Sequence, residues 1–306
     1  MKLSFIFPGQ GSQAFGMGLS FYENSIKAKE LLDNASDFCK IDFKNLLFIE
    51  NENLNKSEYT QMAIVLNSLM AYEVLNENIN LKPRFALGHS LGEFSALGVQ
   101  KAFDYFDLIS LVNKRGKFMQ EDCSKIQAGM MVILGLDDQV VENICKDAQN
   151  NGKKIFPANY NCDGQLVVAG LRNDLSEFED KFKQAGAKRA MLLNMSVASH
   201  CPLLENASFK LSEELKINLK DNFDDVISNV NASPYNDKNQ ALKLLSEQLI
   251  KPVLYKQSIK NIDNDVDLYV EFGASVLKGL NKKISQKNTY SLTNMQDLDE
   301  ILKVLG

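Results

Sequence analysis

The segment Gly88-His89-Ser90-Leu91-Gly92 holds the residues with the clearest chemical potential. It is a GxSxG pattern, which places a serine on a sharp turn between a strand and a helix. The apolar run before it predicts a short strand and the run after it predicts a helix, so the pattern lies in the context that it needs. A Cβ at residue 88 or 92 would collide with the neighbouring strand or helix. We therefore predict that Ser90 is a nucleophile.

The helix predicted to begin near Leu91 adds a second feature to this turn. Its first backbone N–H groups have no partner within the helix, and its positive dipole end points toward Ser90. Negative charge that develops on an acyl oxygen would be stabilised at such a place. The segment therefore indicates acyl transfer through a covalent serine intermediate.

A serine hydroxyl needs a base to become a useful nucleophile at neutral pH, and the chain has two histidines, His89 and His200. Neighbouring side chains of an extended segment alternate in direction, so His89 is expected to point away from the Ser90 hydroxyl. This leaves His200 as the predicted base. Cys201 beside it lacks an elbow, and buried cysteines are usually inert, so we exclude it as a second nucleophile.

The elements that must position these residues alternate between strands and helices. Strands are predicted over 3–7 and 84–88, and the helical spacing of apolar residues covers 18–38, 57–77 and 104–120. Strands and helices alternate again after His200. Such alternation is typical of a parallel α/β domain.

Residues 127–196 follow a different order, which is strand, helix, strand, strand, helix, strand. This βαββαβ order is that of the ferredoxin-like split unit. We therefore expect a large domain over 1–126 and 197–306, interrupted by a small subdomain over 127–196.

Composition and charge exclude several function classes. The 306 residues carry a formal charge of −5 without a basic stripe, which argues against nucleic-acid binding. Five scattered cysteines without CxxC predict free thiols rather than a zinc site, and hence a reducing compartment such as the cytoplasm. No apolar run approaches the ~20 residues of a membrane span. An acidic protein partner would need a local basic patch, for which the candidates are Lys114 with Lys117, Lys188 with Arg189, and Lys278 with Lys282 and Lys283.

Five segments in this order resemble the bacterial malonyl-CoA:acyl carrier protein transacylases: FPGQGSQ at 7–13, GHSLGEFSAL at 88–97, KRGKFMQE at 114–121, SVASHCPLL at 196–204 and EQLIKPV at 247–253. They span nearly the whole chain, and the set is far more specific than any one of them. The resemblance implies an α/β-hydrolase-like domain with a parallel sheet and an inserted ferredoxin-like subdomain.

The resemblance also implies roles for single residues. Ser90 matches the acylated nucleophile and His200 its general base, which the backbone carbonyl at the position of Gln248 orients. The N–H groups of Gln10 and Leu91 match the oxyanion hole. Arg115 matches the arginine that pairs with the free carboxylate of the malonyl group, and Gln61 and Asn159 match further pocket positions.

The implied reaction transfers a malonyl group from malonyl-CoA to the phosphopantetheine thiol of acyl carrier protein, which supplies extender units for fatty acid biosynthesis. It is a ping-pong reaction that needs neither cofactor nor metal. The expected partners are coenzyme A thioesters and an acidic carrier protein, without nucleic acid or membrane.

Two other classes of protein fit parts of the pattern. A serine esterase or lipase would use the same elbow, and Asp163-Gly164 superficially fits the Ser–Asp dyad of a patatin-like hydrolase, although PGQGSQ stands in place of its glycine-rich oxyanion loop. A non-catalytic module that binds coenzyme A or carrier protein is the second alternative. It would have no use for a nucleophile and a base together.

Overall fold

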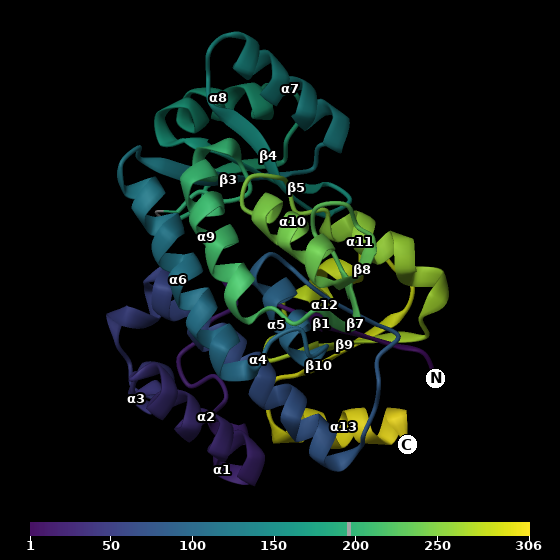
Figure 1. Ribbon diagram of the computed structural model, residues 1–306. Helices are drawn as coiled ribbons and strands as arrows, with labels where there is room; N and C mark the ends of the chain where they lie inside the picture. Colours follow the sequence, from purple (N-terminus) through teal and green to yellow (C-terminus); the bar gives the residue numbers. More distant parts are fainter. Residues whose placement is uncertain (195–196) are drawn as a thin grey trace.

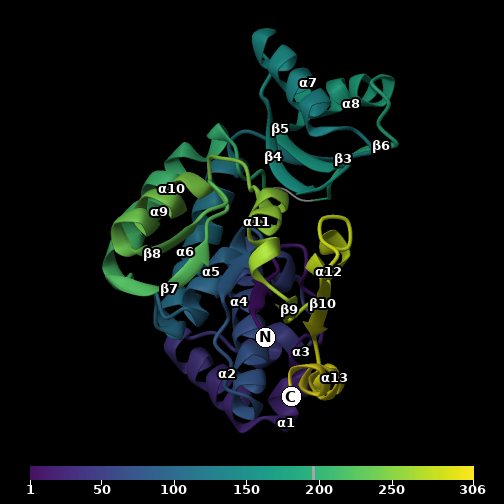
Figure 2. The same cartoon turned by 90° about the vertical axis from the view of Figure 1, so that its right-hand side faces the viewer.

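The computed structural model describes residues 1–194 and 197–306, and its larger sheet lies in the lower part of the molecule, with the smaller sheet above it (Figures 1 and 2). The strand order is β10-β9-β1-β2-β7-β8, parallel except for the antiparallel pair β7–β8. The parallel α/β domain predicted from alternation is therefore confirmed. The strands are β1 (Leu3–Phe7), β2 (Phe85–Gly88), β7 (Asn222–Ile227), β8 (Pro234–Asp237), β9 (Leu268–Phe272) and β10 (Asn288–Leu292).

Helices surround this sheet. They are α1 (Leu19–Asn24), α2 (Ile26–Cys39), α3 (Phe43–Phe48), α4 (Ser57–Asn78), α5 (Leu91–Val99), α6 (Tyr105–Ser124), α9 (Glu205–Asn218), α10 (Lys238–Gln248), α11 (Tyr255–Ile262), α12 (Leu277–Asn281) and α13 (Met295–Leu305). Short 3₁₀ turns cover Glu52–Asn55, Pro202–Leu204 and Asp263–Asp265. Helix α4 is buried on nearly all sides, as expected for a helix that is apolar around its circumference.

The helix predicted over 18–38 is in fact two helices, because Ser25 between α1 and α2 has extended backbone angles. Its hydroxyl accepts a hydrogen bond from the N–H of Ala28 at 3.1 Å, so Ser25 caps the second helix. The periodicity of apolar residues runs through this break and does not reveal it.

The smaller sheet contains β3 (Ala128–Leu134), β4 (Ile155–Cys162), β5 (Gln165–Leu171) and β6 (Arg189–Leu192), in the antiparallel order β4-β5-β3-β6. Helices α7 (Asp138–Asn150) and α8 (Arg172–Gln184) cover one face (Figure 2). The observed order of elements is the predicted βαββαβ. The predicted end of this segment, at 196, lies outside the described residues.

Side chains on the two faces of the small sheet belong to different cores. Met131 and Ile133 of β3 pack with α7 and α8, whereas Met130 and Val132, which alternate with them, pack in the core of the larger sheet. This alternation follows from the two-residue period of a strand. The face away from α7 and α8 is therefore available to line a site shared with the larger sheet.

Backbone hydrogen bonds join the small sheet to the segment after α10. The N–H of Tyr160 donates to the carbonyl of Val253 at 2.9 Å, and the N–H of Val253 donates to Ala158 at 2.8 Å. Lys256 of α11 forms ion pairs with Asp138 and, at 3.1 Å, with Asp163. These contacts hold the small sheet against α11 and the segment that precedes it.

Candidate active site

Ser90 lies between β2 and α5, in a backbone conformation that only a sharp turn imposes. Its φ of 53° and ψ of −105° are unfavourable for a residue with a side chain, and such strain is typical of functional turns. A Cβ on Gly88 would overlap the backbone of Gly92, and a Cβ on Gly92 would overlap the carbonyl of Phe7. Both glycines are therefore needed for the close crossing of β1, β2 and α5.

The side chain of Asn229, which follows β7, holds the two sides of this turn together. Its Oδ1 accepts a hydrogen bond from the backbone N–H of Ser90 at 2.7 Å. Its Nδ2 donates to the carbonyl of Gly88, also at 2.7 Å. The amide stabilises the strained turn by pairing backbone groups that the turn leaves free.

His200 lies against the Ser90 hydroxyl, with 2.7 Å between Nε2 and Oγ. Its Nδ1 is 2.7 Å from the backbone carbonyl oxygen of Gln248. A carbonyl only accepts, so Nδ1 carries the proton and Nε2 is free to accept from the hydroxyl. Burial, reinforced by the charge of Arg115, lowers the pKa of His200 to about 3. The imidazole is therefore neutral at physiological pH and able to take a proton.

Arg115 of α6 reaches the same hydroxyl from another side. It is 1% exposed, and its Nη2 donates to Ser90 Oγ at 3.2 Å and to Gln248 Oε1 at 3.1 Å, while Nη1 donates to Gln61 Oε1 at 2.9 Å. Gly116 permits this approach, since a Cβ there would lie 2.7 Å from Glu58 Cα of α4.

The charge of Arg115 is not neutralised by a direct ion pair within residues 1–194 and 197–306, and its Nε has no hydrogen-bond partner there. Burial lowers the pKa of Arg115 to about 10, so the guanidinium stays charged at neutral pH. A buried charge without a counter-ion costs free energy, and an incoming carboxylate would remove that cost.

Gln10 and Leu91, whose backbone N–H groups are the predicted oxyanion hole, both lie close to Ser90: Gln10 lines the cavity at Ser90, and Leu91 follows Ser90 in the chain. Leu91 is the first residue of α5, so its N–H has no partner inside the helix. Neither N–H makes a hydrogen bond to the described part of the chain. The side chain of Gln10 is fixed separately, because its Nε2 donates to Ser57 Oγ at 3.1 Å.

A cavity of about 100 Å³ opens at the Ser90 hydroxyl. Met130, Asn159 and Val167 of the small sheet form one wall, and Ser90, His200 and Arg115 belong to the other. The Oδ1 of Asn159 is buried and has no hydrogen-bond partner among the residues that the structure describes.

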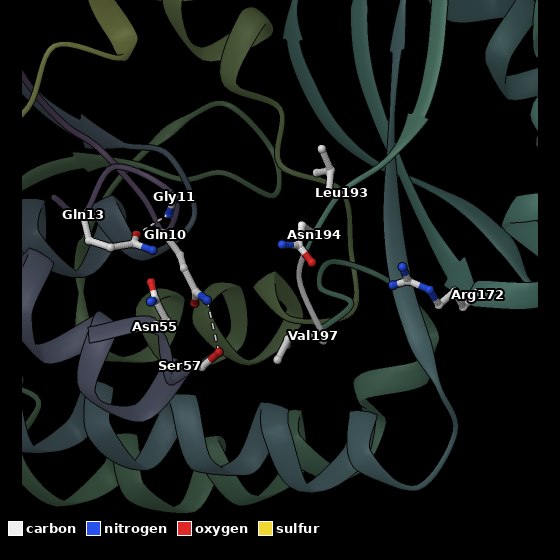
Figure 3. A pocket seen from close by; sticks show the side chains of 9 residues that line it. All are labelled: Gln10, Gly11, Gln13, Asn55, Ser57, Arg172, Leu193, Asn194 and Val197. Carbon is white, nitrogen blue, oxygen red and sulfur yellow. Dashed lines mark hydrogen bonds between the residues drawn. The ribbon is translucent and has the colours of Figure 1, made fainter. Parts of the chain in front are cut away.

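A larger hollow of about 630 Å³ adjoins this cavity and shares Gln10, Leu193 and Val197 with it. Figure 3 shows Gln10 and Ser57 on one side of the hollow and Arg172 on the other. The reactive hydroxyl thus lies beside a space large enough for an extended, partly polar ligand arm.

The chain is similar to known acyltransferases over nearly its whole length. The acyl transferase domain family matches residues 4–295. The malonyl CoA-acyl carrier protein transacylase of Staphylococcus aureus strain MRSA252 is 36% identical over 304 residues, which are 98% of this chain and 97% of that protein. The crystal structure of the Helicobacter pylori malonyl-CoA:acyl carrier protein transacylase superposes with a TM-score of 0.96 at 46% identity and covers 100% of this chain and 98% of that one.

This chain belongs to the malonyl-CoA:acyl carrier protein transacylase family. A further structure similar to it shows a malonyl-transacylase in complex with a type II polyketide acyl carrier protein, with a TM-score of 0.95, 33% identity, and coverage of 99% and 100%. The family agrees with the α/β fold predicted from the sequence. In the part of the chain that the structure describes, no group of three His, Cys, Asp or Glu side chains is suited to a metal ion. No described helix has the length and apolar character needed to cross a membrane.

Three other residues weighed from the sequence lie outside the Ser90–His200 contact. His89 Nε2 donates to Asn161 Oδ1 at 2.8 Å, and burial lowers the pKa of His89. Cys201 is 1% exposed, and burial raises its pKa to about 12, so it forms no thiolate at neutral pH. Asp163 is largely exposed in the turn after β4, where it pairs with lysines of α11, so it cannot serve as the acid of a Ser–Asp dyad.

Several residues that support the site were not predicted from the sequence. Asn229, Glu93 and Tyr235 are buried and hydrogen-bonded around the elbow. Glu93 carries a signal that could have been used, because it is a lone charge in the otherwise apolar helix LGEFSALGV. A charge in such a helix is either paired or functional.

The basic clusters differ in their surroundings. Lys114 pairs with Glu214 at 2.7 Å and Lys117 with Glu58 at 3.7 Å, so that cluster is largely neutralised. The members of the other two clusters have no ion pair among the described residues: Lys188, Arg189, Lys278, Lys282 and Lys283. These are the clusters with charge left for a partner.

Proposed function

We propose that this transacylase-family chain transfers a malonyl group from malonyl-CoA to the phosphopantetheine thiol of acyl carrier protein through a malonyl-Ser90 intermediate. The observation that carries the proposal is the contact of Ser90 Oγ with both the neutral His200 and the charged Arg115. A nucleophile, a base and a carboxylate-binding cation therefore converge on one oxygen.

In the first half-reaction, Ser90 Oγ attacks the thioester carbonyl while its proton passes to His200 Nε2. The negative charge on the carbonyl oxygen is held by the N–H groups of Gln10 and Leu91, and one such donor is typically worth roughly 2.7–4 kcal/mol in the transition state. The carbon–sulfur bond then breaks, and the leaving sulfur takes the proton from His200, which releases coenzyme A as the thiol.

In the second half-reaction, the carrier-protein thiol gives its proton to the same imidazole and attacks the malonyl ester. The bond between the acyl carbon and Ser90 Oγ breaks, and the oxygen recovers the proton from His200. The carbonyl of Gln248 supports both steps, because it keeps the Nδ1 proton of His200 in place.

Selection of the malonyl group is assigned to Arg115, with Gln61 and Asn159 as further pocket residues. A guanidinium binds a carboxylate through two parallel hydrogen bonds, and burial strengthens that pairing. Gln61 holds Arg115 Nη1, and Asn159 contributes an unused acceptor to the wall of the cavity. The larger hollow is proposed to hold the pantetheine arm that both substrates share.

The chain is proposed to consist of a catalytic domain over 1–126 and 197–306 and a small subdomain over 127–196. The enzyme is proposed to act in the cytoplasm and to need no cofactor. The acidic carrier protein would dock on the basic residues that lack an ion pair in the described structure, Lys188 with Arg189 or Lys278 with Lys282 and Lys283.

The test is mass spectrometry of the protein after incubation with malonyl-CoA. We expect a malonyl adduct on the peptide that contains Ser90, lost on addition of carrier protein and absent in Ser90→Ala. An unmodified Ser90 peptide in the native chain would contradict the proposal. Release of malonate to water at the same rate with and without carrier protein would identify a hydrolase instead.

A further inference from the structure

A second buried charge lies directly behind the elbow, on the first turn of α5. The Glu93 side chain is 0% exposed, and the chemistry proposed above gives it no task. Its Oε1 accepts from the hydroxyl of Tyr235 at 2.8 Å. Its Oε2 accepts from the backbone N–H of Asn229 at 3.1 Å and from Gln248 Nε2 at 2.7 Å. Burying a carboxylate costs free energy even when it is hydrogen-bonded, so the position of Glu93 requires a reason.

Two of these donors belong to residues that hold the reactive groups in place. Asn229 bridges the backbone of Gly88 and Ser90 through its side chain. Gln248 provides the backbone carbonyl for His200. Glu93 therefore contacts both supports of the Ser90–His200 pair.

The amide of Gln248 has two chemically different ends, and opposite charges select its orientation. Its Oε1 accepts from Arg115 Nη2 at 3.1 Å, while its Nε2 donates to Glu93 and, at 3.1 Å, to the carbonyl of Ser90. A guanidinium only donates and a carboxylate only accepts, so the reverse orientation would oppose like groups at both ends. The amide thus links the two buried charges.

The charge of Glu93 also bears on the proton that His200 takes. Arg115 lowers the pKa of His200, which disfavours the imidazolium that the proposed reaction requires. Glu93 and Arg115 instead stabilise each other's charged form: Glu93 raises the pKa of Arg115, and Arg115 lowers the pKa of Glu93. The negative charge behind the amide therefore offsets part of the charge of Arg115 itself.

We propose that Glu93 is a positioning residue of the acyl transfer, which orients Gln248 and Asn229 and offsets the charge of Arg115 when His200 is protonated. The inference rests on the proposed function, because it assigns to Glu93 an effect on His200 as a base. It separates the task of Glu93 from that of Arg115, which is to bind the carboxylate.

The test is the variant Glu93→Gln, assayed for malonyl transfer at about pH 8, where the native carboxyl is ionised. The Gln side chain keeps the size of Glu, its oxygen can accept from Asn229 and Gln248, and its NH₂ can donate to the Tyr235 oxygen. We expect kcat to fall about tenfold, because a neighbouring charge typically shifts the proton affinity of a base by about one pKa unit or more. The KM for malonyl-CoA should not rise, because the charge that binds the carboxylate is retained.

The stability of the same variant separates positioning from a structural role. Burial raises the pKa of Glu93 to about 7. A raised carboxyl pKa contributes stability below the unfolded value of 4.5, and that contribution is lost as pH rises through about 7. At about pH 8 the Gln variant, which carries no charge to bury, should therefore have a melting temperature no lower than that of the native chain.

The matched control is Glu271→Gln. Glu271 is also 0% exposed and accepts three backbone N–H groups, from Val276, Leu277 and Lys278, but it contacts none of the proposed site residues. We expect this variant to lose stability and to keep its kcat per folded molecule. Tyr235→Phe is the second test variant, since it removes one donor to Glu93, and its kcat should fall severalfold with KM unchanged.

The outcomes are distinct. An unchanged kcat in Glu93→Gln, or in Tyr235→Phe if the former does not fold, overturns the inference. A rise in KM with unchanged kcat also overturns it, because that result would mean that Glu93 serves only to place Arg115. If the native chain forms no malonyl-Ser90 at all, the proposed function itself has failed.

Discussion

The two walls of the cavity beside Ser90 are built differently. On the wall from the large sheet, Ser90, His200, Arg115 and Gln248 are joined by hydrogen bonds of 2.7–3.2 Å, and three of the four side chains are at most 1% exposed. On the wall from the small sheet, Met130 and Val167 are apolar, and Asn159 has an acceptor without a partner in the described chain.

This difference separates chemistry from fit. A reacting group must be held within a fraction of an ångström, which a connected polar network on rigid elements achieves. An apolar wall with a flexible methionine tolerates changes in shape more easily. Substitutions on the large-sheet wall should therefore affect the rate, whereas those on the small-sheet wall should affect mainly binding.

The largest expected effect comes from removing the base. His200→Ala should slow malonylation of Ser90 by about 10²–10⁴-fold, the range typical for a positioned general base. Rapid-quench measurement of the acyl-enzyme gives the rate directly. His89→Ala is the control, since it removes the other histidine, and it should retain far more activity. Equal losses in both variants would show that the Ser90–His200 contact is not what drives acylation.

The next effect concerns selectivity on the same wall. Arg115→Ala should reduce transfer of malonyl about 10–100-fold more than transfer of acetyl, because it removes the hydrogen bonds between a charged donor and the carboxylate. Arg115→Lys should recover only part of the loss, since an ammonium cannot form the two parallel bonds. A side-by-side assay with malonyl-, methylmalonyl- and acetyl-CoA measures this. Equal loss for all three substrates would remove Arg115 from the role.

A pH titration of stability tests how tightly His200 is buried. Its pKa is lowered to about 3 in the folded chain, against an ordinary value of 6.5. The unfolded chain therefore takes up a proton below pH 6.5 that the folded chain does not, and stability should fall by up to about 1.4 kcal/mol per pH unit as pH drops below 6.5. Urea unfolding of the native chain and of His200→Gln at several pH values isolates this contribution. If the free energy of unfolding changed with pH in the same way in both proteins, His200 would take up its proton as readily in the folded chain as in the unfolded chain.

The smallest expected effect lies on the other wall. Asn159→Ala should raise the KM for malonyl-CoA about 3–10-fold and leave kcat nearly unchanged, which corresponds to the loss of one hydrogen bond to a substrate. Steady-state kinetics with varied malonyl-CoA gives both constants. A fall in kcat larger than the rise in KM would break the distinction between the two walls.

Much of the local structure could be predicted from the chain alone. The strand before Ser90 and the helix after it follow from apolar runs and glycines at fixed positions, and α4 begins at the predicted residue 57. The βαββαβ order was also predictable, because each of its elements has its own periodicity. These features depend on neighbours in the sequence, which is why the sequence contains them.

Other features could not be predicted from neighbours. The residues next to Arg115 in the sequence do not show whether it faces solvent or the interior. Lys114 and Lys117 flank it, and both face solvent in the structure. Only the family resemblance directed it to the pocket. The support given by Asn229, 139 residues after Ser90, left no local signal at all.

The sequence by itself determined a strained serine turn, two histidines from which to choose a base, and the types of element around them. Tertiary structure decided which groups meet: His200 reaches Ser90 across 110 residues, and Gln248 reaches it across 158. The physical reason is that local conformation depends on the dihedral and packing preferences of adjacent residues, whereas contacts between distant residues depend on the order of strands in the sheet.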